Sequence, residues 1–419
     1  MYPNTIKGCQ TRQQIYVGFT AMVKDLVANL HSHGYADTTV SFYEQAAVHF
    51  SFWLTRRNIS PSQLKENHLD GFLSRHLPRC HCPFGGVRQH NTVRAGLGHF
   101  AEILKGAGYM PAAETEEVDG VTLEVRLFDD FLLNTVGLQE ATRLYRRRYV
   151  GEFLNEFFPN GNVDVSGLAP QSIVSYLSKR GSRLKAASTK VLASSLRSYF
   201  RFLRLHGRCE ENLVLAVPAS ASWRLASLPP ALTDDEVARL LSAFDRGTVA
   251  GRRDYAITRC LVDLGLRAQE VARLRLEDVD WRQGILRIVG TKSRRDDELP
   301  LTAAIGAAFA AYIRRGRPKT TGRELFLRLR PPIGQCMTRR TVCNVILRAA
   351  SRAGLESTVT GTRILRHTAA TRMLRRGASI KEIADVLRHK CLDTTAIYMK
   401  VDLPRLTAVA LPWPIEGDL

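Results

Sequence analysis

The chain has 419 residues, 45% of them hydrophobic, and its 60 Lys and Arg residues outnumber 40 Asp and Glu residues to give a formal net charge of +20. This length exceeds one ordinary compact core, so two or three domains are expected. The positive excess favours a polyanionic partner, above all nucleic acid, over a merely soluble basic protein. No stretch approaches 18 consecutive apolar residues, so we expect no membrane partner.

The eight cysteines are scattered, and no segment resembles a secretory signal, which favours a reducing bacterial cytoplasm. Cys80 and Cys82 lie near His76, His81 and His90, a combination that suggests a zinc site. The C-x-C spacing lacks a second well-spaced pair, however. We therefore expect no bound metal.

Residues 34–54 and 137–157 share a pattern: a glycine, a polar run containing threonine, and then apolar residues at helical spacing. This spacing predicts a helix with one buried face in each stretch. The residues predicted to be buried are Phe42, Phe50 and Leu54, and then Leu144, Tyr145, Tyr149, Phe153, Leu154 and Phe157. Each stretch is followed by a short predicted helix and then a longer one. These helices cover residues 69–76 and 92–104 after the first stretch, and residues 171–179 and 188–205 after the second. We therefore expect a duplicated helical bundle.

Two segments are typical of linkers: the acidic residues 110–120, and residues 217–230, which are rich in Pro, Ser and Ala. They divide the chain into a helical N-terminal domain, a second helical bundle, a third domain and a tail. The expected ranges are 1–112, 121–217, 228–403 and 404–419. For the tail, packing on a neighbouring protomer and disorder are equal alternatives.

Basic residues recur at helical spacing on the second bundle, with few acidic residues in the same runs. Phosphate contact is therefore favoured over a solvated charged face. The basic turn of a hairpin in the third domain adds two more arginines. The candidate DNA-binding residues are Arg143, Arg146, Arg147, Lys190, Arg197, Arg201, Arg294 and Arg295.

The third domain is predicted to be mainly helical. Thr233 and Glu236 form a capping-box pattern before an apolar run, which predicts a helix start. Residues 284–301 are the exception, because apolar residues there alternate with polar ones around a long basic turn, a pattern that predicts a β-hairpin. The expected fold class is mainly α with a small antiparallel β-sheet in the C-terminal domain.

Four separated segments of this domain present cationic or nucleophilic side chains. Gly265 ends one predicted helix, so Arg267 lies at the N-terminus of the next, where anions bind well. Arg363 and Arg366 share one helix face. Taken singly, such residues are most often surface charges or core residues. The full set is Arg267, Lys292, Arg363, Arg366, His389 and Tyr398.

The order of these residues resembles that of the tyrosine recombinases, also called phage integrases. The family's first arginine motif is matched by Arg267, its hairpin lysine by Lys292 and its second arginine by Arg366. Its later histidine is matched by His389, and its nucleophile by Tyr398. The resemblance implies a tyrosine recombinase catalytic fold, preceded by helical bundles similar to the family's SAM-like core-binding domain.

Two positions depart from the family pattern. Arg363 stands where the family usually has histidine or lysine, and Arg388 where it usually has glycine. A guanidinium can donate to a phosphate, but it is a poor proton acceptor because its pKa is above about 12. Any base role of the first position is therefore expected to pass to His389.

The resemblance implies an enzyme that cleaves and rejoins DNA strands through a 3′-phosphotyrosyl bond on Tyr398. Arg267 and Arg366, with Arg363, would stabilise the charged phosphate, and Lys292 would protonate the leaving 5′ oxygen. Since the phosphotyrosyl bond conserves the energy of the broken bond, no cofactor is expected. The implied partners are double-stranded DNA and further protomers, as a homotetramer on two DNA sites, alone or with sister recombinases, in the integration or excision of a mobile element.

Two other interpretations remain open. A DNA-relaxing enzyme similar to type IB topoisomerases would use similar residues without pairing two sites. A DNA-binding regulator or inactive paralogue would bind DNA without cutting it, and Arg363 and Arg388 would then mark decay of the site.

Overall fold

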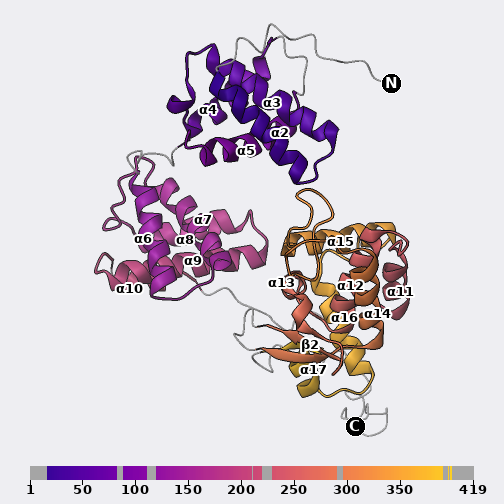
Figure 1. Cartoon of the computed structure of the whole chain (residues 1–419). Helices are drawn as coiled ribbons and strands as arrows, with labels where there is room; N and C mark the ends of the chain where they lie inside the picture. The colour runs from indigo at the N-terminus through magenta and orange to yellow at the C-terminus, as the bar shows by residue number, and fades with distance from the viewer. Residues whose placement is uncertain are drawn as a thin grey trace. The chain divides into compact units, whose positions relative to one another are not determined.

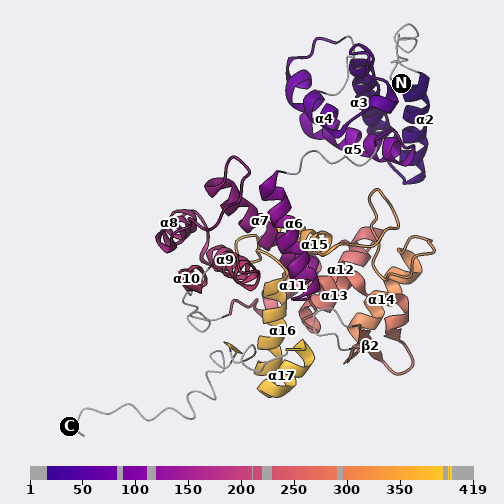
Figure 2. The same cartoon turned by 90° about the vertical axis from the view of Figure 1, so that its left-hand side faces the viewer.

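The computed structural model describes residues 17–82, 88–110, 119–209, 211–218, 229–289, 296–389, 395 and 397–398 (Figures 1 and 2). Pro111–Trp223 forms one compact unit, and Met1–Met110 with Arg224–Leu419 forms the other. The larger hydrophobic cores draw their residues from 19–110, from 121–217 and from 232–365. No helix within the described ranges is both long and apolar enough to cross a membrane.

The first core is built by helices around a group of aromatic side chains. Helices α3 and α5 pack closely, and α2 packs against both. Phe19, Phe50, Phe72 and Phe100 are completely buried between them. Helix α2 was not predicted from the sequence. The elements are α2 (Val17–Ser32), α3 (Asp37–Thr55), η1 (Pro61–Gln63), α4 (Glu66–Gly71), the π-helical turn η2 (Phe72–His76), η3 (Leu77–Arg79) and α5 (His90–Gly106).

The second core repeats this helix order, as the shared sequence pattern predicts. Its elements are α6 (Gly120–Asn134), α7 (Glu140–Phe157), α8 (Pro170–Gly181), α9 (Ala186–Leu205) and the short α10 (Glu211–Leu215). Helices α7 and α9 contribute its buried aromatic side chains, among them Tyr149, Phe153, Tyr199 and Phe200.

The predicted burial is wrong at the start of α7, where Leu144 and Tyr145 are 55% and 54% exposed. Arg143 and Arg147 take the face toward α6 instead, because both pair there with Asp129. Successive helix residues point about 100° apart, so the apolar pair turns outward. In the first bundle, Phe42 of α3 was likewise predicted to be buried and is 44% exposed.

The third core confirms the mainly helical prediction with its small sheet. The hairpin pairs antiparallel, with Leu286 opposite Leu299, and a short strand that was not predicted, β1, adds to its edge. The elements are α11 (Asp234–Ser242), α12 (Val249–Asp263), α13 (Ala268–Arg273), η4 (Leu276–Asp278), β1 (Val279–Asp280), β2 (Ile285–Ile288), β3 (Asp297–Pro300), α14 (Ala303–Arg315), α15 (Arg339–Arg352), α16 (Arg363–Arg375) and α17 (Ile380–Leu387).

Local caps fix where the helices of this domain begin. The Thr233 side chain accepts from the backbone N–H of Glu236, and Ser379 caps α17 in the same way through Glu382. Helices α16 and α17 bury a small core of their own, which includes Leu374, Leu387 and Tyr398. These two helices, with the end of α12 and the start of α13, bring the candidate site together.

Candidate active site

The side chain of Arg267 is held at the start of α13 by Glu270. Arg267 donates to this carboxylate twice, from its backbone N–H and from Nη1, at 2.7 Å in each case. Glu270 is buried, whereas the Arg267 side chain stays 36% exposed. The arginine is therefore fixed in direction while its guanidinium can still reach a ligand.

Gly265 allows the end of α12 to lie directly against the two helices that carry the other site residues. Its φ of +61° is a conformation that side chains disfavour. A Cβ atom there would also lie 2.5 Å from Cδ2 of Leu387 and 3.3 Å from Cβ of Ala369. The absence of a side chain thus sets the distance between Arg267 and α16.

Arg366 is held by two helix ends. Its Nη1 donates to the carbonyl of Gly265 at 2.6 Å, just after α12, and its Nη2 donates to the carbonyl of Leu387, the last residue of α17. Helix C-termini carry partial negative charge, which suits a cation. Burial, followed by the charge of Arg267, lowers the pKa of Arg366 to about 9, so the side chain remains protonated at neutral pH.

Arg388 binds the same carboxylate as Arg267. Its backbone is left-handed, with φ of +55°, which accounts for the glycine usual at this position in the family. The side chain donates to Oε2 of Glu270, and both partners are almost fully buried. Burial alone would raise the pKa of Glu270, but Arg388 and Arg267 outweigh it and lower that pKa. The ionised Glu270 therefore links α13 to the end of α17.

Tyr398 is buried, with 1% of its surface exposed, and its hydroxyl lies 2.8 Å from Nδ1 of His367. The Nε group of Arg363 donates to Nε2 of the same imidazole at 3.1 Å. Burial lowers the pKa of His367 to about 4, so this ring is neutral at neutral pH. Because Nε2 accepts from Arg363, the single ring proton belongs to Nδ1, and His367 donates to the tyrosine oxygen.

His367 is thus not the group that removes the tyrosine proton. Burial raises the pKa of Tyr398 to about 12, and the charges of Arg366 and Arg363 oppose that rise. These same two cations, with the donor on His367, would stabilise a tyrosine oxygen as it becomes negative.

His389 follows α17 and is the second neutral imidazole of the site. Its Nδ1 lies 2.7 Å from the hydroxyl of Thr395. Burial, and then the charges of Arg366 and Arg267, lower the pKa of His389 to about 4. A neutral imidazole among cations can accept a proton, which Arg363 cannot.

The structure brings together Arg267, Arg363, Arg366, His389 and Tyr398, which were named from the sequence, and their catalytic roles stay predictions. Lys292, Arg294 and Arg295 lie outside the described residues, as does the tail from 404 to 419. The sequence analysis did not assign a role to His367. Its position directly after Arg366 in the second arginine motif was the available signal.

The expectation that the basic residues of α7 lack acidic partners is wrong for Arg148, which donates to Glu152 at 2.9 Å, and for Arg143 and Arg147. Arg143 and Arg147 donate to Asp129 of α6 at 3.1 and 2.8 Å, and both also donate to Glu140. Asp129 lies in a helix that the sequence analysis did not predict, so its pairs with these two arginines were missed. Both guanidinium groups are already engaged.

The other candidate DNA-binding residues of this bundle differ in whether their side chains already donate hydrogen bonds within the protein. Arg146 donates to the hydroxyl of Ser198, and Arg197 donates to the carbonyls of Val217 and Pro218 at 3.1 and 3.0 Å. The remaining two, Lys190 and Arg201, are exposed on α9.

Fold and site together define a class: a mainly helical protein in which Arg363, Arg366 and a neutral histidine lie around a buried tyrosine. Residues 230–404 match the model of the phage integrase family. A Sinorhizobium fredii protein named as an integrase/recombinase is 37% identical and spans 89% of each chain. Tyrosine recombinase XerD of Pseudomonas putida is 31% identical over 67% of this chain and 93% of its own.

The chain belongs to the phage integrase family and is an enzyme of the tyrosine recombinase type. Solved structures agree with its fold. XerH recombinase bound to its difH substrate has a TM-score of 0.55 at 18% identity, over 72% of this chain and 99% of that chain. A lambda integrase dimer bound to a core site has a TM-score of 0.53 at 18% identity, over 65% of this chain and 96% of that chain.

Proposed function

We propose that this chain is a site-specific recombinase that cleaves and rejoins double-stranded DNA through a 3′-phosphotyrosyl intermediate on Tyr398. The observation that carries the proposal is the contact of the Tyr398 hydroxyl with neutral His367, beside Arg363 and Arg366. The names of the relatives, which are integrases and recombinases, support it. So do neighbours in fold whose structures contain DNA.

In the proposed reaction, the oxygen of Tyr398 forms a bond to phosphorus while the bond from phosphorus to the 5′ oxygen breaks. The negative charge of the five-coordinate phosphate falls on its non-bridging oxygens, where Arg267 and Arg366 would donate. His389 is the residue proposed to accept the tyrosine proton, since His367 already carries its proton on the nitrogen that faces the tyrosine. Lys292 would protonate the departing 5′ oxygen.

The tyrosine must leave its buried position for this attack, because no phosphate can reach a hydroxyl that is buried against His367. We propose that DNA binding supplies the free energy for this release. A phosphate held by Arg267 and Arg366 would replace the tyrosine as the neighbour of these cations.

The proposal extends to assembly and biological role. Four copies, alone or with sister recombinases, would act on two DNA sites to integrate or excise a mobile element. The three hydrophobic cores support separate domains over 1–112, 121–217 and 228–403. The second and third domains would bind DNA between them. A type IB-like relaxing enzyme and a non-cutting regulator remain the competing functions.

A pool of nicked duplexes of random sequence tests the proposal, because a nick beside the cleavage site releases a short fragment and traps the covalent adduct. Wild type is expected to form adducts that survive denaturation and share a sequence. Tyr398→Phe is expected to form none while still binding DNA, since only the attacking hydroxyl is lost.

The competing functions give different results in the same assay. A regulator would trap no adduct with either protein. A relaxing enzyme would trap adducts without sequence preference, relax supercoiled plasmid, and yield no joined products from two copies of the selected site. Either result would overturn the proposal.

A further inference from the structure

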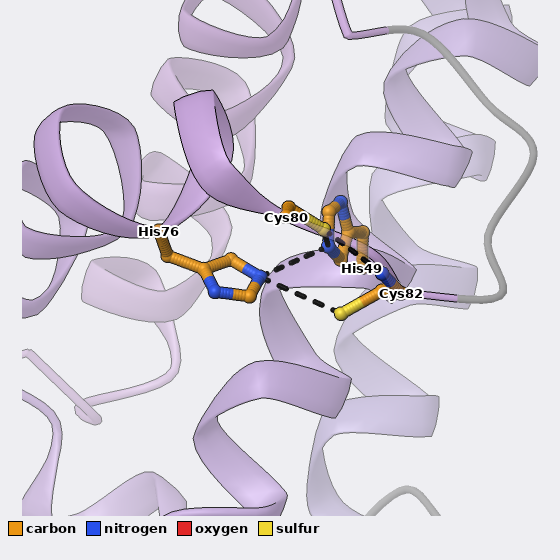
Figure 3. Close-up of side chains that lie close together, drawn as sticks. All are labelled: His49, His76, Cys80 and Cys82. Carbon is orange, nitrogen blue, oxygen red and sulfur yellow. Dashed lines mark hydrogen bonds between the residues drawn. The ribbon is translucent and has the colours of Figure 1, made fainter.

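Four potential metal ligands converge in the first bundle, far along the chain from the recombinase site (Figure 3). His49 lies on α3, His76 ends the turn η2, and Cys80 and Cys82 follow η3. Figure 3 shows all four side chains pointing toward one another. Their nearest nitrogen and sulfur atoms all lie within 4.8 Å of each other, and no other such group occurs among the described residues.

Three distances within this cluster lie close to those between ligands of one tetrahedral ion. Nε2 of His49 lies 3.3 Å from Nε2 of His76 and 3.2 Å from Sγ of Cys80, and Sγ of Cys82 lies 3.6 Å from Nε2 of His76. With Zn–N of about 2.0–2.1 Å and Zn–S of about 2.3 Å, neighbouring ligand atoms of a tetrahedron are about 3.3–3.8 Å apart.

Hydrogen bonds alone do not account for the arrangement. If both thiols donate to the imidazoles, the Nε2 atoms of His49 and His76 face each other with two lone pairs at 3.3 Å. If His76 carries the proton on Nε2 instead, it cannot accept from Cys82. A cation at the centre uses all four lone pairs at once.

Neighbouring groups of the bundle hold these side chains in fixed orientations. The rings of both histidines pack against Phe72, which fixes their orientation. The backbone N–H of Cys82 donates to Sγ of Cys80 at 3.2 Å, a contact that orients this sulfur atom.

We propose that His49, His76, Cys80 and Cys82 bind a structural zinc ion. Two nitrogen and two sulfur donors in a tetrahedron select zinc, and four protein ligands leave no open position for catalysis. The ion fastens the chain after η3 to the middle of α3. The zinc site lies in a core that shares no residue with the recombinase site. The zinc proposal can therefore be tested independently of the proposed function.

Metal analysis of the full-length chain tests this site. The protein, purified under reducing conditions from zinc-supplemented cells, is expected to carry a single zinc ion per chain. Cys82→Ser and His76→Asn are expected to lose it. His81→Ala and Cys209→Ser are the matched controls, because each removes a ligand-type side chain outside the cluster, and both are expected to keep the zinc.

Two measurements on wild type keep the test decisive if a variant fails to fold. X-ray absorption at the zinc edge is expected to show two sulfur neighbours at about 2.3 Å and two nitrogen neighbours at about 2.0–2.1 Å. After zinc removal, Co²⁺ is expected to give thiolate-to-cobalt charge-transfer bands. Wild type that holds no zinc and gives no such bands, or zinc that persists in Cys82→Ser, overturns the proposal.

Discussion

At the scale of single residues, the position of the ring proton of His367 decides which residue can accept the proton of Tyr398. Arg363 can only donate, so its contact with Nε2 of His367 leaves the ring proton on Nδ1, facing Tyr398. An arginine where the family usually has histidine therefore does more than replace a phosphate donor. It sets the tautomer of the imidazole that contacts Tyr398, the proposed nucleophile.

Acidification is expected to destabilise the protein between pH 6.5 and about 4. The folded pKa values of His367 and His389 are lowered from 6.5 to about 4, so over this window the unfolded chain takes up protons that the folded chain does not. The stability contributed by the neutral rings is complete above pH 6.5 and is lost as pH falls through the window.

Urea unfolding midpoints at pH 7 and pH 5.5 measure this effect. The double variant His367→Gln/His389→Gln lacks both titrating rings, so its midpoint is expected to fall less than that of wild type between these two values. Equal falls in the two proteins would contradict the assignment of neutral histidines.

Replacing Arg388 separates backbone strain from charge pairing. Arg388→Ala removes a partner of buried Glu270 and is expected to cost about 3 kcal/mol of unfolding free energy. Arg388→Gly loses the same pair but suits φ of +55°, so it is expected to cost about 1 kcal/mol less. Denaturant titrations give both values, and an alanine variant as stable as the glycine variant would contradict the account.

At the scale of elements, the packing of α12 against α16 and α17 depends on one glycine. Gly265→Ala is expected to cost about 1–2 kcal/mol for the left-handed backbone, and about 1–3 kcal/mol more because Leu387 must move. Gly284→Ala is the matched control: its φ is +68°, and nothing lies within 4 Å of the added Cβ.

Thermal or urea unfolding of the two alanine variants gives the cost of packing as their difference. We expect Gly265→Ala also to slow adduct formation, because Arg366 donates to the carbonyl of that residue. Equal stability losses at the two glycines would show that the contact with Leu387 is unimportant.

Local signals in the sequence were sufficient for several elements. Ser379 with Glu382, and Thr233 with Glu236, predicted two helix starts, because capping needs only residues three apart. The alternating residues of 284–301 predicted the hairpin for the same local reason. The resemblance to a family supplied the arginines, His389 and Tyr398.

Contacts between distant segments could not be predicted in this way. Asp129 meets Arg143 from α6, a helix that the sequence analysis overlooked although its buried residues recur at helical spacing. His49 and Cys80 are 31 residues apart, and only the bundle brings them together. The sequence analysis therefore named His76 beside Cys80 and Cys82 but missed His49, the fourth ligand of the proposed zinc site.

At the scale of the whole molecule, a net charge of +20 makes DNA binding depend steeply on salt. Lys190→Ala and Arg201→Ala each remove an exposed cation of α9 and are expected to reduce the slope of log affinity against log salt by about 1. Arg143→Ala is expected to leave the slope unchanged, because Asp129 and Glu140 already neutralise that guanidinium.

Fluorescence anisotropy with a duplex oligonucleotide across a salt series measures these slopes. Arg143→Ala serves as the control for a change that affects the fold of the bundle but not its phosphate contacts. A slope that falls for Arg143→Ala but not for Arg201→Ala would reverse our assignment of the DNA-facing residues.

The burial of Tyr398 has a consequence for a protein that meets chromosomal DNA continually. So basic a chain touches countless phosphodiesters by chance, and an attacking group on its surface would leave nicks wherever it landed. Because the hydroxyl of Tyr398 is buried and contacts His367, it is not exposed to DNA in such encounters. Under the proposed function, the tyrosine would be released only when Arg267 and Arg366 hold a phosphate of a bound DNA site, so a brief encounter would not activate it.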